Sequence, residues 1–137
     1  MKISLGAVLL ALVMAGSAVA AGPVARTYNA PVERVWNTTE AVLKHLGWDV
    51  DRADRNIGFI TTDSRRVDGE NYGVYEKALR HRLRLHVKAL DARRTTVSVE
   101  RELFKRERIL FVDNDEPVTA PDHTVEQTLL DAIGKGL

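Results

Sequence analysis

Apolar residues recur at steps of three and four between Val32 and Leu46, and this spacing places them on one face of a helix. Pro31 suits the first turn of such a helix, because proline lacks the N–H group that would have no partner there. We expect Asn29 to help satisfy the free N–H groups of that turn. Gly47 is expected to end the helix in the left-handed conformation. The pattern therefore predicts one amphipathic helix.

Apolar and charged residues alternate strictly from Leu79 to Leu90, which predicts a half-buried strand of an antiparallel sheet. Turn-forming residues separate this stretch from a second alternating stretch that starts at Thr95. If the two stretches pair as a hairpin, Arg84 lies opposite either Glu100 or Glu102. A basic row would then face an acidic row, and such pairs help to fix the register.

Short apolar stretches on either side of these elements predict further strands. Residues 48–53 and 57–63 flank a segment with turn chemistry, so we expect them to form a hairpin. Gly58 within the second stretch indicates either a bulge or a close approach by the helix. Residues 26–29 precede the helix and predict a short edge strand.

The patterns in the second half of the chain are less regular. Residues 64–77 are polar and contain two glycines, which predicts a long loop. The stretch 103–112 fits either one strand or two, and residues 113–121, with two prolines, predict a loop. A last helix is expected over 124–133, with Asp122 as its N-cap. This order predicts an α+β fold, an antiparallel sheet of four to six strands packed on one long helix, with a short C-terminal helix.

The first residues have the pattern of a targeting segment. Lys2 precedes a mostly apolar stretch, and Ala18–Ala20 has the small residues of a cleavage site. The apolar stretch is short for a membrane anchor. We therefore expect a cleaved Sec-type signal peptide over residues 1–20 and a single periplasmic domain over residues 21–137, with no membrane span.

Cysteine is absent from the chain, so we expect an exported domain held by its core without disulfides and without a lipid on cysteine. The chain has 20 basic and 19 acidic residues, and loss of Lys2 with the signal peptide would leave the mature domain balanced. A balanced domain lacks the basic excess expected of a general nucleic-acid binder. We therefore do not expect nucleic acid as a partner. The expected export makes envelope proteins the possible partners.

No pattern of residues in the sequence marks a catalytic or metal site. The four histidines have no ligand spacing on a shared face. Residues 113–116 begin like a calcium loop, but the glycine and the glutamate that such a loop needs are missing. Ser64 and Ser98 stand outside any nucleophile motif. The sequence predicts a non-enzymatic protein without a cofactor.

Two groups of side chains are candidate contact sites. The first is a possible partner surface that consists of Arg80, Arg82, Arg84, Lys88, Tyr72, Tyr75, Arg101, Lys105 and Arg106. Its alternative is a solvated sheet face neutralised by glutamates. The second is a possible apolar pocket lined by Trp36, Trp48 and Phe59, which would make the protein a periplasmic carrier of a small apolar ligand between helix and sheet. Ordinary core packing is the alternative for these aromatic residues.

Four stretches of the chain share a pattern with a known family. Tyr28–Trp36 opens the predicted helix, Leu46–Trp48 closes it, Ala53–Asp63 forms the next hairpin, and Arg80–Val87 alternates arginine with apolar residues. Together they resemble the BamC-like (NlpB/DapX) helix-grip domains of bacterial envelope proteins, in which a sheet grips one long helix. Members of that family are linked to outer-membrane protein assembly as accessory subunits. The resemblance implies a helix-grip-like domain that serves as a protein-interaction module.

Overall fold

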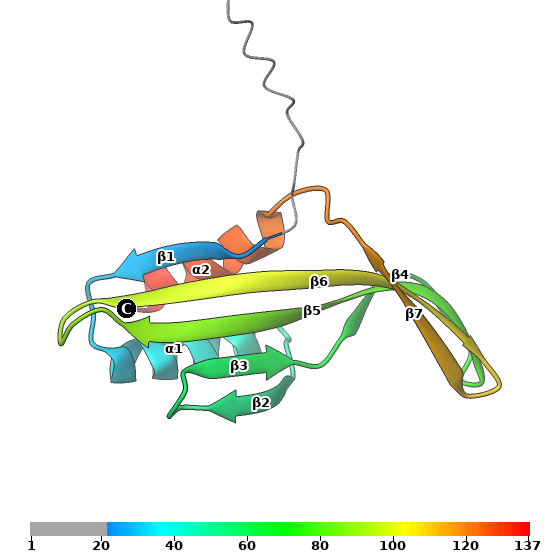
Figure 1. Ribbon diagram of the computed structural model, residues 1–137, viewed down its shortest axis with the longest axis horizontal. Helices are drawn as coiled ribbons and strands as arrows, with labels where there is room; N and C mark the ends of the chain where they lie inside the picture. Colours follow the sequence, from blue (N-terminus) through cyan, green and yellow to red (C-terminus); the bar gives the residue numbers. More distant parts are fainter. Residues whose placement is uncertain (1–21) are drawn as a thin grey trace, which may run out of the picture.

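The computed structural model describes residues 22–137, so the predicted signal peptide lies outside the described residues. The described part contains seven strands and two helices (Figure 1). The strands are β1 (Val24–Tyr28), β2 (Val50–Asp54), β3 (Phe59–Thr62), β4 (Arg65–Asn71), β5 (Tyr75–Ala89), β6 (Thr95–Ile109) and β7 (Val112–Val118). The helices are α1 (Val32–His45) and α2 (Thr124–Gly136).

A long hairpin of β5 and β6 runs through the whole sheet, and each of its strands has 15 residues. All pairings in the sheet are antiparallel. One half of the hairpin lies in a five-stranded part of the sheet with the order β1-β6-β5-β3-β2. We call this part of the sheet and the two helices the body. The other half is flanked by β4 and β7, and we call this four-stranded part the arm. Figure 1 shows the arm extending away from the helices.

Both helices pack on one face of the body and contact each other. α1 contacts β5, while α2 contacts β1 and β6. The side chains between the layers form one hydrophobic core, which includes Val35, Leu43, Ile60, Leu83, Leu85, Val97, Val99, Leu129, Leu130 and Ile133. The predicted α+β class, the antiparallel sheet and the C-terminal helix are confirmed. The expected number of four to six strands is wrong, because the arm adds β4 and β7 to give seven.

The ends of α1 follow the sequence only in part. Pro31 is the N-cap, and no side chain caps the helix, so the role expected of Asn29 is wrong. Gly47 has a φ of +83° and ends the helix as predicted. The N–H of Trp48 donates to the carbonyl of Leu43 at 2.9 Å, the six-to-one hydrogen bond of a Schellman motif. This motif turns the chain from α1 towards β2.

α2 begins at Thr124 as predicted, but its N-cap is one residue later than the expected Asp122. His123 is the N-cap, while the Asp122 carboxylate accepts a hydrogen bond from the N–H of Thr124 at 3.0 Å. This bond is the main cause that lowers the pKa of Asp122. One turn further, the buried Glu126 places its Oε2 atom 2.5 Å from His123 Nδ1. These contacts stabilise the first turn of α2.

Two predicted loops are strands in the structure. Residues 64–77 contain β4, and residues 113–121 contain β7. The stretch 103–112, left open between one strand and two, holds the end of β6, a turn and the start of β7. Neither β4 nor β7 has the alternation of a half-buried strand, because nearly all their side chains are exposed. Both are edge strands held by backbone pairing, a position that tolerates Pro117.

Gly58 lies where the β2–β3 turn meets β5, and the approach there is made by a strand and not by the helix. Its φ is +69°, and a Cβ at this position would lie 2.1 Å from the carbonyl oxygen of Val87. The Val87 N–H also donates to the Gly58 carbonyl at 2.7 Å, so the two backbones cannot move apart without losing this bond. Only glycine fits this contact.

We therefore expect Gly58→Ala to lower the free energy of unfolding by about 2 kcal/mol, measured by urea denaturation. Gly73→Ala is the matched control, because Gly73 also has a positive φ, +80°, but faces open space. It should show only the smaller backbone cost. Equal losses in the two variants would contradict the role of the close contact with β5.

Candidate interaction site

The arm is held together by a network of ions around one buried carboxylate. The Glu76 side chain is 1% exposed, and its Oε1 accepts a hydrogen bond from Arg80 Nη1 at 2.8 Å. Its Oε2 lies 3.5 Å from Arg108 Nη1 and 3.3 Å from Asn71 Nδ2. Arg80 also donates to the hydroxyl and the carbonyl of Ser64, both at 2.9 Å. These contacts tie β4, β5 and β6 together.

Two further ion pairs join β6 to β7. Arg108 Nε donates to Asp113 at 2.6 Å, and Arg106 Nε donates to Asp115 at 2.9 Å. The hydrogen bonds from these guanidiniums are the main cause that lowers the pKa of each carboxyl. The charged groups of this face are therefore paired with one another and do not form a free patch.

The far end of the arm is apolar and exposed. Ile109, Leu110, Phe111 and Val112 are 52%, 64%, 77% and 70% exposed. The neighbouring turn between β4 and β5 adds the exposed Tyr72 and Tyr75. The two turns touch, because the N–H of Phe111 donates to the carbonyl of Val74 at 3.4 Å. We call these six exposed side chains, Ile109, Leu110, Phe111, Val112, Tyr72 and Tyr75, the tip.

The turn at the tip is strained. Leu110 and Phe111 have φ values of +51° and +67°, the sign that a two-residue type I′ hairpin turn requires at both positions. Asparagine and glycine are preferred there, since a bulky L residue costs roughly 1–2 kcal/mol in the left-handed region. Strain that is kept while two large apolar groups point into water indicates a functional site. The sequence signal for it was the apolar run 109–112 between charged stretches.

The predicted basic surface is largely neutralised. Arg84 pairs with Glu100 in the register, so the predicted alignment of the basic and acidic rows is confirmed. Arg82 forms an ion pair with Glu102, and Arg84 Nη2 lies 2.8 Å from the same carboxylate. Arg80 and Arg106 belong to the ion network of the arm. All four of these arginines are therefore paired with carboxylates of the protein itself.

The other residues of the predicted surface lie far from one another. Lys88 is exposed near the end of β5 opposite to the tip, where it pairs in register with Thr96. Lys105 borders an open hollow of about 420 Å³ on the arm. Arg101 donates to His81, which pairs in register with Arg65 of β4 at the junction of body and arm. Arg82 and Arg106 of the predicted surface both lie over the Phe104 ring, but their charges are paired with acids. Tyr72 and Tyr75 come together at the tip.

The three aromatic residues of the predicted apolar pocket do not line one cavity. Trp36 and Trp48 are buried in the core between helices and sheet. Phe59 neighbours the fully buried Ile60 on β3 and therefore points to the opposite face of the sheet. There its ring stands 5.1 Å from the ring of His86. Core packing accounts for the two tryptophans. The three aromatic residues therefore do not form the ligand cavity that the carrier hypothesis requires.

A buried histidine lies at the junction of body and arm. The ring of His81 is 4.6 Å from the ring of Trp48, and Arg65 stacks on that tryptophan at 3.6 Å. Arg101 Nε approaches His81 Nδ1 at 2.9 Å, and Arg65 Nε approaches Nε2 at 3.2 Å. Burial, with the charges of Arg101 and Arg65, lowers the pKa of His81 from 6.5 to about 4. The neutral ring accepts a hydrogen bond at one nitrogen only.

We expect the stability of the protein to fall as the pH drops from 6.5 towards 4, because the unfolded chain then binds a proton at His81 that the folded chain does not. Above pH 6.5 this contribution is fully present. With allowance for solvent screening, the loss between pH 7 and pH 5 should be about 1 kcal/mol. Urea denaturation of His81→Gln should lack this part of the pH dependence, while His86→Gln on the exposed face should keep it. Identical profiles for the two variants would contradict it.

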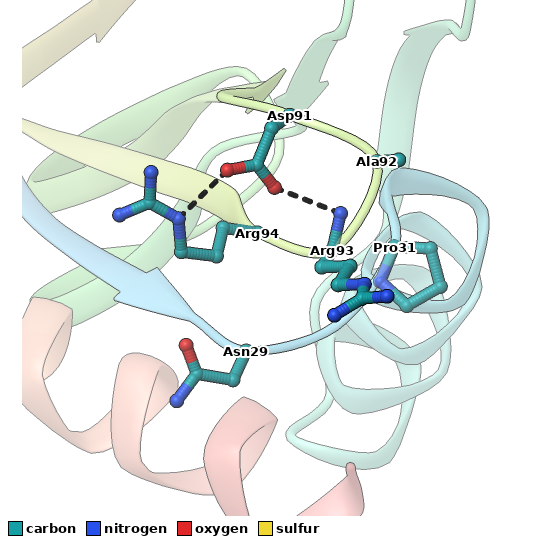
Figure 2. A pocket seen from close by; sticks show the side chains of 6 residues that line it. All are labelled: Asn29, Pro31, Asp91, Ala92, Arg93 and Arg94. Carbon is teal, nitrogen blue, oxygen red and sulfur yellow. Dashed lines mark hydrogen bonds and ion pairs between the residues drawn. The ribbon is translucent and has the colours of Figure 1, made fainter.

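An open hollow lies beside the turn between β5 and β6, at the end of the long hairpin opposite to the tip (Figure 2). It measures about 800 Å³ and is lined by Asn29, Pro31, Asp91, Ala92, Arg93 and Arg94. Its one carboxylate, Asp91, accepts hydrogen bonds from the Arg93 N–H at 2.8 Å and from Arg94 Nε at 2.9 Å, which lower its pKa. These bonds hold the β5–β6 turn, so the carboxylate of this hollow has a structural role.

Metal and membrane sites can be considered for residues 22–137 only. Among them, no three His, Asp or Glu side chains are arranged to hold a metal ion. No helix in this range has the length and apolar character that crossing a bilayer requires.

Comparisons with known proteins give little further information. No protein-family model matches the chain, and no curated protein matches it. A crystal structure of a TBP-like protein from Parabacteroides distasonis ATCC 8503 is similar over 81% of this chain and 91% of that chain, with 11% sequence identity and a TM-score of 0.45. A similarity of this size carries no information about function. The resemblance to BamC-like domains stays a prediction.

Proposed function

We propose that the protein is an exported, non-enzymatic interaction domain of the bacterial cell envelope, and that it makes its contact through the tip of the arm. In this proposal the body is of the helix-grip type and serves as a rigid support that holds the arm in place. One observation carries the proposal, namely the pair Leu110 and Phe111, which are highly exposed and held in a strained turn. A protein without a contact to make there gains nothing from either feature.

The tip offers enough apolar surface for a reversible contact. Burial of a Leu or Phe side chain is worth about 1.5–3 kcal/mol, and Leu110 and Phe111 keep about two thirds or more of their surface in water. Ile109 and Val112 add to this term. Because the arm and its strained turn are already formed, the contact does not have to order a flexible loop, which would reduce its affinity.

A binding assay with envelope material tests this proposal. The domain of residues 21–137 is mixed with washed envelopes of the native host and sedimented. We expect Leu110→Asp to lower the bound fraction at least about tenfold, because a charge would enter the apolar contact. Leu90→Asp is the matched control, since Leu90 is also an exposed leucine, 51%, but lies at the opposite end of the long hairpin. Equal binding of both variants would contradict the proposal.

Export is tested separately. We expect the protein in the periplasmic fraction of its native host, with Ala21 as the first residue by N-terminal analysis. Retention of residues 1–20 on a cytoplasmic protein would contradict the envelope part of the proposal.

A further inference from the structure

We propose that the tip inserts into the interfacial layer of a lipid bilayer. This inference rests on the proposed function and names the partner of the same site. Three properties of the tip support it. The tip projects from the molecule, the base nearest to it is paired with acids, and several of its backbone N–H groups are hydrogen-bonded.

The shape of the tip suits a medium that surrounds it. Tyr75 and Ile109 stand opposite each other in the register of β5 and β6, and Ile109 stands opposite Val112 in the register of β6 and β7. Leu110 and Phe111 occupy the turn beyond them. The apolar groups thus come from two adjacent turns at the end of a projecting arm (Figure 1). A lipid layer can surround the apolar side chains of such a projecting end on all sides. The surface of a protein partner is better suited to covering a flat apolar patch.

The base nearest the tip can approach a membrane without losing its acidic partners. Arg108, the nearest base on β6, contacts Asp113 at 2.6 Å and Glu76 at 3.5 Å. From Lys105 to Glu116 there are three basic and four acidic residues, so this hairpin has no basic excess. Attraction to anionic headgroups is therefore not the driving force, and the apolar side chains are.

Part of the backbone of the tip is already hydrogen-bonded, which lowers the cost of entering an apolar medium, where unpaired N–H groups are costly. The Phe111 N–H donates to the Val74 carbonyl at 3.4 Å, and the Tyr72 N–H donates to the Tyr75 carbonyl at 2.7 Å. The Gly73 N–H donates to the Asn71 side chain at 2.8 Å. The strands behind the turns have free edges, so insertion stops at the interface, roughly 5–10 Å deep.

The two tyrosines fit this depth. Tyrosine has an apolar ring and a polar hydroxyl and is enriched at the level of the lipid headgroups. Tyr72 and Tyr75 are 69% and 48% exposed and come from the turn beside Leu110 and Phe111. Their rings would lie at the boundary, while Leu110 and Phe111 reach furthest into the acyl region.

Vesicles of pure lipid test the inference. The domain of residues 21–137 is incubated with phosphatidylcholine vesicles, with and without phosphatidylglycerol, at low and high salt. We expect binding to both vesicle types that changes less than about twofold with salt. Leu110→Asp should lower binding at least about tenfold, and Leu90→Asp should not. Urea denaturation of both variants shows that the fold is retained.

A fluorescence measurement locates the tip in the bilayer. In Phe111→Trp the new indole should be quenched by lipids brominated near the headgroup end of the acyl chain. The wild type, whose Trp36 and Trp48 are buried, should not be quenched. If the domain bound only the vesicles that contain phosphatidylglycerol, and high salt abolished this binding, the inference would be overturned.

The inference and the proposed function can fail independently. Binding to envelopes that depends on Leu110, without binding to pure lipid vesicles, would overturn the lipid inference and leave a protein partner at the tip. Absence of binding to both materials would overturn the inference and the proposed function together.

Discussion

Replacement of Leu110 by Asn together with Phe111 by Gly is expected to raise the free energy of unfolding by about 1–3 kcal/mol and to lower envelope binding at least about tenfold. The gain arises because asparagine and glycine adopt the positive φ values of +51° and +67° without the strain of bulky side chains. The loss of binding arises because the variant removes the two most prominent apolar groups of the tip. Urea denaturation and the envelope sedimentation assay measure the two effects.

The alanine pair, Leu110→Ala with Phe111→Ala, separates the two effects. It removes the apolar side chains but keeps two L residues in the left-handed region, so we expect the loss of binding with little gain in stability. If the Asn–Gly variant were less stable than the wild type, the turn would not be strained. If it bound envelopes as well as the wild type, the tip would not be the contact.

Glu76→Ala is expected to lower the free energy of unfolding by about 3 kcal/mol. The substitution leaves Arg80 and Arg108, whose side chains are only 16% and 23% exposed, without the carboxylate that they share. The arm has few buried apolar side chains to compensate, mainly Ala78, Leu103 and Phe104. Urea denaturation measures the loss of stability.

Hydrogen exchange should locate this loss in the arm. Amide protons of β4 and β7 should exchange faster in Glu76→Ala, while those of the body, which has its own core, should change less. Glu107→Ala is the matched control, because Glu107 is an exposed glutamate of the same arm, and its effect should stay within about 0.5 kcal/mol. A loss below about 1 kcal/mol for Glu76→Ala would mean that the ion network does not hold the arm together.

The sequence predicted the body well, because its elements have one apolar face each. The period of three and four residues located α1, and strict alternation located β5 and the start of β6. The sequence left two registers of the hairpin open, and the structure has the one that places Arg84 opposite Glu100. These predictions succeeded because burial of one face leaves a direct trace in the sequence.

The arm was missed for the opposite reason. β4 and β7 are exposed on both faces, so neither has an apolar period that could distinguish a strand from a loop. Their partner strands hold them through backbone bonds and ion pairs such as Arg106 with Asp115. These pairs depend on a register that the sequence does not display.

Whether the candidate site residues come together depends on which residues pair across the strands and on which face of the sheet each side chain lies. The sequence left Arg82 open between a partner surface and a face neutralised by glutamates, and in the structure its neighbour across the hairpin, Glu102, binds it. Phe59 reads as a partner of Trp36, but the alternation of β3 places it on the other face of the sheet. The run 109–112 was read as strand because a tight turn of bulky residues contradicts ordinary turn preferences. Such a contradiction is typical of a functional site.

The most direct test of the tip as the contact site is photocrosslinking in intact cells of the native host. A benzophenone amino acid replaces Phe111 in one variant and Leu90, an exposed leucine at the opposite end of the long hairpin, in the other. The proposal predicts adducts with envelope lipid or with one envelope protein at position 111, and none at position 90. Absence of adducts at 111, or equal adducts at both positions, would contradict it.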